Sequence, residues 1–306
     1  VSGKKIVPTT VRFVDIAGLV RGASSGQGLG NAFLSHIRET DAIAMVVRCF
    51  EDENVTHVEG GPDPKRDIEI IAIELALADL SSLQKRVDKL EREARVNPKL
   101  KPKVDAAKNL VAALEAGNPA RSFKADSLER EVANESFLLT AKPLLFVANV
   151  DEAQIGHPGP LVDQVKDVAK AEGSPVVVLS GKIESELAGL TEAEARDFCH
   201  ELGIARSGLD ELALTAYDLL GLMTYLTAGE IEVRAWTIEK GSRAPQAAGK
   251  IHSDIERGFI RAEIVSYHDY VKYQTMEALR AAGRLRSEGK EYIMQEGDVV
   301  NFRFNV

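Results

Sequence analysis

Asp15 and Gly18 are the first residues along the chain whose types and spacing suggest chemistry. In the segment FVDIAGLVRGASSGQGLG (residues 13–30), an apolar run ends in the aspartate and the glycine follows three positions later. At a strand end, such an aspartate can hold the water shell of Mg²⁺, and a glycine N–H can approach a γ-phosphate because no Cβ intrudes. The pair predicts a site for Mg²⁺ and nucleotide, and the glycines after Gly18 are expected to move when the γ-phosphate is lost. An ordinary turn is the alternative.

The segment Asn149-Val150-Asp151-Glu152 directly follows a buried apolar run. Guanine-specific hydrolases place N-K-x-D at such a point, and the aspartate accepts hydrogen bonds from guanine N1–H and N2–H₂. Here Glu152 takes the fourth position and Val150 replaces the lysine. The longer carboxylate fits guanine less well, whereas an asparagine amide and backbone groups can address adenine N6 and N7. The segment predicts a preference for ATP over GTP, with Asp151 as an alternative carboxylate.

A hydrolase must also orient the attacking water. Leu19 occupies the position after Gly18 where a glutamine often does this, and an apolar side chain cannot replace it. His57, in the polar segment EDENVTHVEGG, is the catalytic candidate, and a structural or merely exposed histidine is the alternative.

The chain has no G-x-x-x-x-G-K-[ST] window, the loop that cradles the α- and β-phosphates. We expect that loop upstream of Val1, and without it we expect this chain to bind nucleotide weakly or not at all. The glycines of GQGLGN (residues 26–31) do not form a dinucleotide-binding motif, because that motif needs a different spacing immediately after a strand.

Apolar runs that alternate with helical segments must position these residues. Strands are predicted at residues 9–18, 41–50, 143–150 and 174–182, with helices between them. This alternation favours a doubly wound α/β sheet, whose ligands bind at the carboxyl ends of the strands. Asp15, Asn149 and Ser180 are predicted to lie at such ends. Ser180 is the first residue of the segment SGKIE.

A long helical interruption separates the second and third predicted strands. Residues 67–96 contain no glycine or proline, and apolar residues recur at spacings of three and four on both sides of NPKLKP (Leu80, Leu83, Val87, Leu90; Val104, Ala107, Val111, Leu114). Two antiparallel helices in a short coiled coil are predicted.

The same interruption is locally basic. Residues 84–108 carry nine Lys or Arg against four Asp or Glu, in a chain whose net charge is -9. The stretch is either a solvated helix face or a contact to RNA phosphates. The candidate RNA contacts are Lys85, Arg86, Lys99, Lys101 and Lys103.

After about residue 222 the pattern changes to short strands with helices among them. Strands are expected in IEVRAWTIEKG, FIRAEIVSY, EYIMQ and DVVNFRFNV, and helices in QAAGKIHSDIERG and TMEALRAAGRL. A small α+β domain of about 80 residues is within the normal size of a domain.

The composition limits the cellular compartment expected for the chain and the classes of partner that it can bind. The 306 residues include no apolar run long enough to span a bilayer, so no membrane contact is expected. Two cysteines, Cys49 and Cys199, cannot build a disulfide framework, which favours a cytoplasmic location. The acidic balance argues against broad attraction to nucleic acid, and no DNA binding is expected.

Long segments of the chain resemble the YchF proteins, the Obg-like ATPases. These include FVDIAGLVRGASSGQGLGNAFLSHIRETDAIAMVVRCFED, ANVDE, AGEIEVRAWTI, APQAAGKIHSDIERGFIRAE and GDVVNFRFNV, and the resemblance covers essentially all residues. It implies a P-loop hydrolase domain (residues 1–80 and 138–222), a coiled-coil insertion (81–137) and a C-terminal TGS domain of β-grasp form (223–306).

The resemblance also implies functional roles. The family prefers ATP through an N-x-x-E loop, matched by Asn149 and Glu152, and the position of Val150 contributes backbone contacts to adenine. A hydrophobic residue replaces the usual glutamine, matched by Leu19, and the proposed catalytic histidine falls in the loop of His57. Family members associate with ribosomes, so the basic stretch and the TGS domain are the expected contacts.

Two functions follow from these observations. The first is an ATPase switch with Mg²⁺ as cofactor and the ribosome or its RNA as partner. The second is a ribosome- or protein-binding scaffold in which hydrolysis is incidental.

Overall fold

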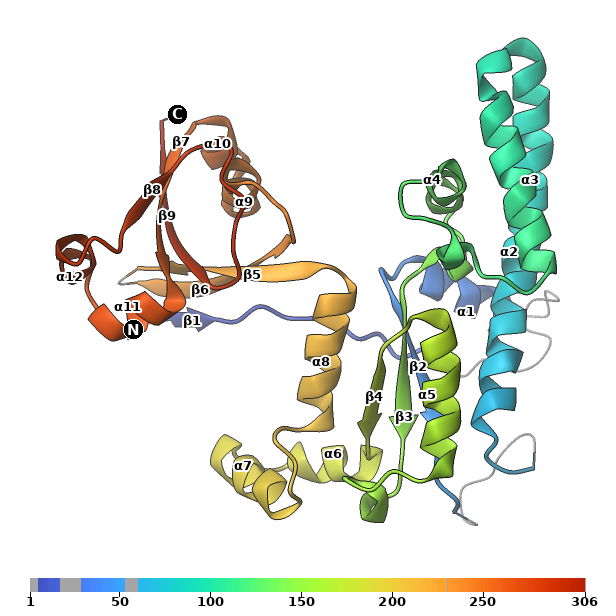
Figure 1. The fold of residues 1–306 in the computed structure, drawn as a ribbon, viewed down its shortest axis with the longest axis horizontal. Helices are drawn as coiled ribbons and strands as arrows, with labels where there is room; N and C mark the ends of the chain where they lie inside the picture. Colours follow the sequence, from blue (N-terminus) through green and yellow to red (C-terminus); the bar gives the residue numbers. More distant parts are fainter. Residues whose placement is uncertain (1–4, 17–28, 53–59, 230, 306) are drawn as a thin grey trace. The chain divides into compact units, whose positions relative to one another are not determined.

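The computed structural model describes residues 5–16, 29–52, 60–229 and 231–305 (Figure 1). The chain divides into two compact units. The larger unit is Val14–Ala216, and the smaller unit joins Val1–Phe13 to Tyr217–Val306.

The larger unit contains a parallel sheet with the order β2-β3-β4. Its strands are β2 (Ile43–Arg48), β3 (Leu144–Asn149) and β4 (Val176–Leu179). The helices before, between and after these strands are α1 (Leu29–Arg38), α5 (Pro160–Glu172), α6 (Gly181–Leu187), α7 (Glu192–Glu201) and α8 (Gly208–Leu219). Phe146 and Ala148 of β3 are fully buried and pack against α5. The predicted α/β sheet is confirmed for these three strands.

The coiled-coil insertion is confirmed. It consists of α2 (Pro64–Val96), η2 (Pro98–Leu100) and α3 (Lys101–Glu115), followed by η3 (Ala120–Ser122), α4 (Leu128–Glu135) and η4 (Leu139–Ala141). Figure 1 shows α2 and α3 side by side. The predicted seam is buried except for Leu80 and Val111, which are partly buried, and Leu110 joins it as a fully buried residue. Leu110 was missed because the 3-4 spacing was continued through Val111.

One helix, α2, belongs to both parts of the larger unit. Ile68 and Leu75, in its first half, pack with the sheet, whereas Leu83 and Leu90 pack inside the helical hairpin. Asp79 lies between these halves and is completely buried.

The Asp79 carboxylate connects α2 to η4, which leads into β3. It accepts hydrogen bonds from the N–H groups of Leu139 and Thr140, both at 2.8 Å, and from Thr140 Oγ1 at 2.7 Å. Burial raises the pKa of this carboxyl, and the hydrogen bonds from Thr140 and Leu139 oppose that rise. The base of the hairpin is therefore attached to the central strand by a fully hydrogen-bonded buried side chain.

The predicted strand at residues 9–18 is wrong for the residues that the structure describes. The strand β1 is Lys5–Val7, and residues 8–16 have no strand pairing; Gly18 lies outside the described residues. The prediction counted β-branched and aromatic residues, but such residues form a strand only beside a partner strand. The available ladder is taken by β1, which pairs parallel with β6 (Glu232–Glu239) of the smaller unit.

The smaller unit is a mixed sheet with the order β1-β6-β5-β9-β7-β8. Its remaining strands are β5 (Leu222–Ala228), β7 (Phe259–Ser266), β8 (Arg286–Glu288) and β9 (Asp298–Phe304). Its helices are α9 (Ala244–Ile251), α10 (Ser253–Arg257), α11 (Tyr267–Tyr273) and α12 (Met276–Ala281). Tyr225, Ile238, Ile264 and Phe302 form one core with α9. This arrangement agrees with the expected β-grasp form.

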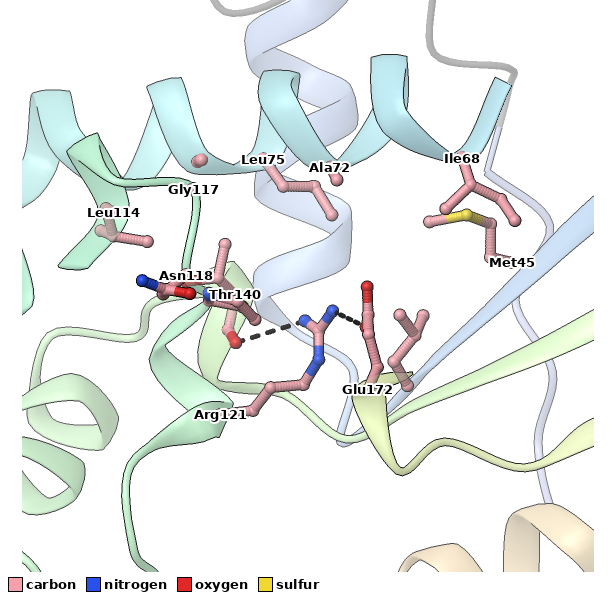
Figure 2. A pocket seen from close by; sticks show the side chains of 13 residues that line it. Met45, Ile68, Ala72, Leu75, Leu114, Gly117, Asn118, Arg121, Thr140 and Glu172 are labelled. Atoms are coloured by element: carbon pink, nitrogen blue, oxygen red, sulfur yellow. Dashed lines mark hydrogen bonds and ion pairs between the residues drawn. The ribbon is translucent and has the colours of Figure 1, made fainter. Parts of the chain in front are cut away.

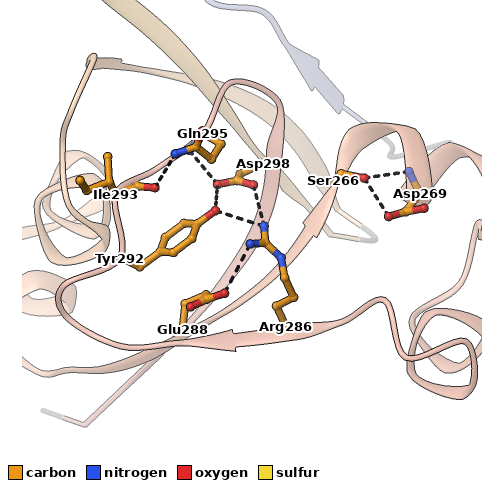
Figure 3. A network of polar contacts seen from close by, with 8 residues as sticks. All are labelled: Ser266, Asp269, Arg286, Glu288, Tyr292, Ile293, Gln295 and Asp298. Carbon is orange, nitrogen blue, oxygen red and sulfur yellow. Dashed lines mark hydrogen bonds and ion pairs between the residues drawn. The ribbon is translucent and has the colours of Figure 1, made fainter.

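The expected strand EYIMQ is also wrong. Residues 291–295 make a single antiparallel bridge, between Ile293 and Arg243, and β8 lies earlier in the chain. The buried Asp298 fixes this segment, because its carboxylate accepts hydrogen bonds from Tyr292 Oη and the Gln295 N–H, both at 2.9 Å. Figure 3 shows this network, which Arg286 completes.

Candidate nucleotide-binding site

The carboxyl ends of β3 and β4 lie next to each other, and each is followed by a polar loop. Asn149, the last residue of β3, is in register with Leu179, the last residue of β4. The loops at residues 149–154 and 180–182 therefore leave the same edge of the sheet, where open α/β sheets bind ligands.

Asn149 is held in one orientation by the neighbouring loop. The Gly181 N–H donates to Asn149 Oδ1 at 2.9 Å. Because a backbone N–H can only donate, the amide oxygen must face Gly181, and the amide Nδ2 faces away from it. Asn149 thus presents a hydrogen-bond donor, the group that a purine N7 requires.

Val150 is 2% exposed as a whole residue, with its backbone included. Its side chain belongs to the core between the sheet and α5. Its N–H donates to the Leu179 carbonyl at 2.9 Å. The remaining backbone group is the Val150 carbonyl, a hydrogen-bond acceptor.

Glu152 forms an ion pair that the sequence did not predict. Its Oε2 lies 2.7 Å from Lys182 Nζ, across the two loops. This interaction raises the pKa of Lys182. The lysine stands inside the segment SGKIE, but only the folded register places it opposite Glu152.

Asp151, the alternative carboxylate, serves as a cap. It accepts a hydrogen bond from the Glu152 N–H at 2.6 Å, and its own N–H donates to Gln154 Oε1 at 3.2 Å. These contacts begin η5 (Glu152–Gln154). The Asp151 carboxylate therefore contacts its own backbone, although the residue is exposed, whereas the half-buried Glu152 reaches across to Lys182.

Ser180 lies beneath the surface. It is 1% exposed, and its carbonyl accepts from the Glu184 N–H at 3.0 Å in the first turn of α6. Glu184 in turn accepts from the N–H groups of Gly208 and Leu209, at 2.7 and 3.2 Å. A contact between Ser180 and a base stays a prediction.

The phosphate side of the site is only partly described. Asp15 is exposed in the extended segment at the start of the larger unit and does not end a strand. Gly18, Leu19 and His57 lie outside the described residues. Within the described ranges, no group of three His, Cys, Asp or Glu side chains could hold a metal. The single carboxylate of Asp15 suits Mg²⁺, an ion that keeps several of its waters.

The basic stretch separates into paired and unpaired side chains. Arg86 lies 3.3 Å from Glu135, and Lys103 lies 2.8 Å from Glu131 and 2.7 Å from Glu135, both acids of α4. Lys85, Lys99 and Lys101 are exposed, and none of them has an ion pair with any described residue. Of the five predicted RNA contacts, three therefore keep an uncompensated charge.

A separate small cavity lies between α2, the start of β3 and the turn at residues 117–121. Figure 2 shows its apolar wall, which includes Ile68 and Leu75, and the polar group Arg121. Arg121 donates to Glu172 at 2.5 Å and to the Thr140 carbonyl at 3.4 Å. The cavity is at the amino end of β3, away from the strand ends that carry the two loops, so it is not the nucleotide site.

Two domain models match the chain. MMR_HSR1, described as a 50S ribosome-binding GTPase, matches residues 3–95. YchF-GTPase_C, described as a protein of unknown function (DUF933), matches residues 222–305. Within the described ranges, none of the helices is long and apolar enough to cross a bilayer.

Curated proteins match over the full chain. The ribosome-binding ATPase YchF of Bacillus subtilis (strain 168) is 49% identical over 309 residues, which cover 100% of this chain and 84% of that protein. The ribosome-binding ATPase YchF of Escherichia coli O157:H7 is 45% identical over 307 residues, with the same coverage.

Solved structures also match. The YchF GTPase of Schizosaccharomyces pombe superposes with a TM-score of 0.87 at 38% identity, over 98% of this chain and 82% of that one. A GTP binding protein from Pyrococcus horikoshii OT3 has a TM-score of 0.58 at 19% identity, over 89% of this chain and 81% of that one, and shares the fold.

Proposed function

The chain belongs to the YchF family, and from this premise we propose that the protein binds and hydrolyses ATP as a molecular switch that works with the ribosome. Because the 306 residues contain no G-x-x-x-x-G-K-[ST] loop, we expect this chain by itself to bind ATP weakly. The bacterial relatives are named ribosome-binding ATPases, whereas the Schizosaccharomyces pombe relative is named a GTPase. The base preference is therefore the point on which this chain's own residues matter most.

The observation that carries the proposal is the pair of loops at the carboxyl ends of β3 and β4, which a hydrogen bond and an ion pair hold together. Asn149 Nδ2 would donate to the purine N7, and the Val150 carbonyl beside it would accept from the adenine 6-amino group. Guanine has a carbonyl oxygen, O6, at that position, which would face the Val150 carbonyl. This arrangement of one donor and one acceptor supports ATP over GTP. Glu152 and Ser180 complete the proposed base side.

The phosphate side carries the proposed catalytic roles. Asp15 would hold the water shell of Mg²⁺, which neutralises charge on the phosphates when it is bound, and the Gly18 N–H would contact the γ-phosphate. Leu19 cannot orient water, so we assign that task to His57. The glycines that follow Gly18 would respond to loss of the γ-phosphate.

Titration calorimetry with ATP and GTP tests the base assignment. We expect Asn149→Ala to weaken ATP binding about five- to tenfold, because it removes the N7 donor and the contact to Gly181. Asn134→Ala, on the exposed surface of α4, is the matched control and should leave ATP binding unchanged. Tighter binding of GTP than of ATP would contradict the assignment, and binding of neither would end the proposal for this chain.

Turnover tests His57 separately. We expect His57→Ala to abolish most ATP hydrolysis while the dissociation constant for ATP stays the same, because the side chain would act on water rather than on the nucleotide. Normal hydrolysis by this variant would show that His57 is not catalytic.

We also propose that the tip of the helical hairpin contacts ribosomal RNA. Lys99 and Lys101 would supply the charge, with Lys85 on the same hairpin, because the charges of Arg86 and Lys103 are compensated by α4. Phosphate contacts of this kind weaken with salt.

Ribosome co-sedimentation at several salt concentrations tests this contact. We expect the double variant Lys99→Glu/Lys101→Glu to bind ribosomes less tightly and with a smaller salt dependence. The control variant Lys166→Glu/Lys170→Glu, on the exposed face of α5, makes the same change of net charge. It should leave ribosome binding and its salt dependence unchanged. Equal binding by both double variants would exclude the tip. Ribosome binding that persists in His57→Ala with or without ATP would favour the scaffold function.

A further inference from the structure

Lys182 and Glu152 form an ion pair at the proposed base side of the site, and no motif used above explains it. We propose that Lys182 shifts the base preference toward adenine, because its ion pair with one oxygen of the Glu152 carboxylate competes with bidentate binding of guanine. This inference rests on the proposed nucleotide site and adds to it a residue that determines specificity.

The argument begins with the hydrogen bonds of the two bases. Guanine offers two adjacent donors, N1–H and N2–H₂, and a carboxylate binds both when both of its oxygens are available. Adenine offers one exocyclic amino group and no N1–H. Lys182 Nζ lies 2.7 Å from Glu152 Oε2, and Oε1 has no ion pair with this lysine. Oε1 can accept from the adenine amino group without competition, whereas guanine needs both oxygens and must compete with the Lys182 ammonium for Oε2.

The backbone holds both partners in place. Glu152 is the first residue of η5, and its N–H is fixed by the Asp151 carboxylate. Lys182 is the second residue of α6, directly after Gly181, whose N–H binds Asn149. The hydrogen bond that orients the Asn149 amide therefore also places Lys182 opposite Glu152. Two consecutive residues, Gly181 and Lys182, therefore contact both Asn149, the proposed N7 donor, and Glu152.

Solvent limits the size of the effect. The side chains of Lys182 and Glu152 are 68% and 36% exposed, so the attraction between them is screened. Guanine that binds through both oxygens competes with Lys182 for Oε2. We expect that competition to reduce GTP affinity by about two- to fivefold relative to a site without the lysine.

The test compares dissociation constants for ATP and GTP in the full chain. Lys182→Met removes the charge and keeps an unbranched side chain. We expect it to tighten GTP binding about two- to fivefold and to change ATP binding by less than about twofold. Lys182→Arg should keep the wild-type ratio of the two constants. Lys170→Met, an exposed lysine of α5, is the matched control for the loss of one positive charge.

A double-mutant cycle tests whether Lys182 acts through Glu152. In the Glu152→Gln background, Lys182→Met should leave the ratio of ATP to GTP affinity unchanged, because the carboxylate is already absent. A full effect of Lys182→Met in that background would overturn the inference, and so would an unchanged ratio in Lys182→Met alone. Both results leave ATP binding by the wild-type chain intact. Binding of neither nucleotide by the wild type would instead overturn the proposed function, and the inference with it.

Discussion

Replacing Asp79 with asparagine tests how firmly the helical hairpin is attached to the sheet. The substitution keeps the size of the side chain but replaces one acceptor oxygen with an NH₂ group. In the wild type, Oδ1 accepts from the Leu139 N–H, and Oδ2 accepts from the Thr140 N–H and hydroxyl. The new NH₂ group would face at least one buried N–H, so that donor loses its acceptor and meets a second donor.

The expected loss of stability follows from these contacts. One buried N–H without an acceptor costs about 1–3 kcal/mol, and the contact between two donors adds to this. The Thr140 hydroxyl keeps another partner, because it accepts from the Ala120 N–H at 3.3 Å. The substitution also removes the buried negative charge of Asp79, which offsets part of this loss of stability. We expect Asp79→Asn to lower the free energy of unfolding by about 2–4 kcal/mol.

Urea unfolding followed by far-ultraviolet circular dichroism measures this change, since α2 and α3 belong to the larger unit. Fluorescence of Trp236, the single tryptophan, reports on the smaller unit and should change less. Asp88→Asn is the matched control, because Asp88 is exposed on the same helix and should cost less than about 0.5 kcal/mol. Equal losses in the two variants would refute the role assigned to Asp79.

Three further predictions concern other parts of the chain. Arg303 lowers the pKa of Glu263, so the stability from this pair is present above the unfolded pKa and is lost as the pH falls through the folded value. Glu263→Gln should therefore cost about 1 kcal/mol at pH 7 and less below about pH 4, as measured by urea unfolding at both pH values. Phe137 is 68% exposed and has a φ of 52°, so Phe137→Gly should raise the free energy of unfolding by about 0.5–1 kcal/mol, and a loss would contradict this. Tyr292→Phe removes the hydroxyl that donates to Asp298 and should lower the free energy of unfolding by about 1–2 kcal/mol, as measured by Trp236 fluorescence. An unchanged free energy of unfolding would show that the network is dispensable.

The sequence alone determined the features that depend on local pattern. The apolar spacing of three and four residues predicted α2 and α3, because a helix brings such positions onto one face whatever surrounds it. The buried apolar runs predicted β2, β3 and β4, and the polar residues directly after them located the two loops that lie at one edge of the sheet. The long segments shared with YchF proteins identified the family.

Only the tertiary structure decided the features that depend on a partner distant in the chain. Residues 9–16 have the composition of a strand but lack a neighbouring strand to pair with, and a second apparent strand at residues 291–295 makes only one bridge, with Arg243. Arg86 and Lys103 read as free positive charges until α4 brings glutamates to them. The contact between Glu152 and Lys182 spans thirty positions of sequence. Charge compensation and strand pairing act through space, so residue type alone could not predict them.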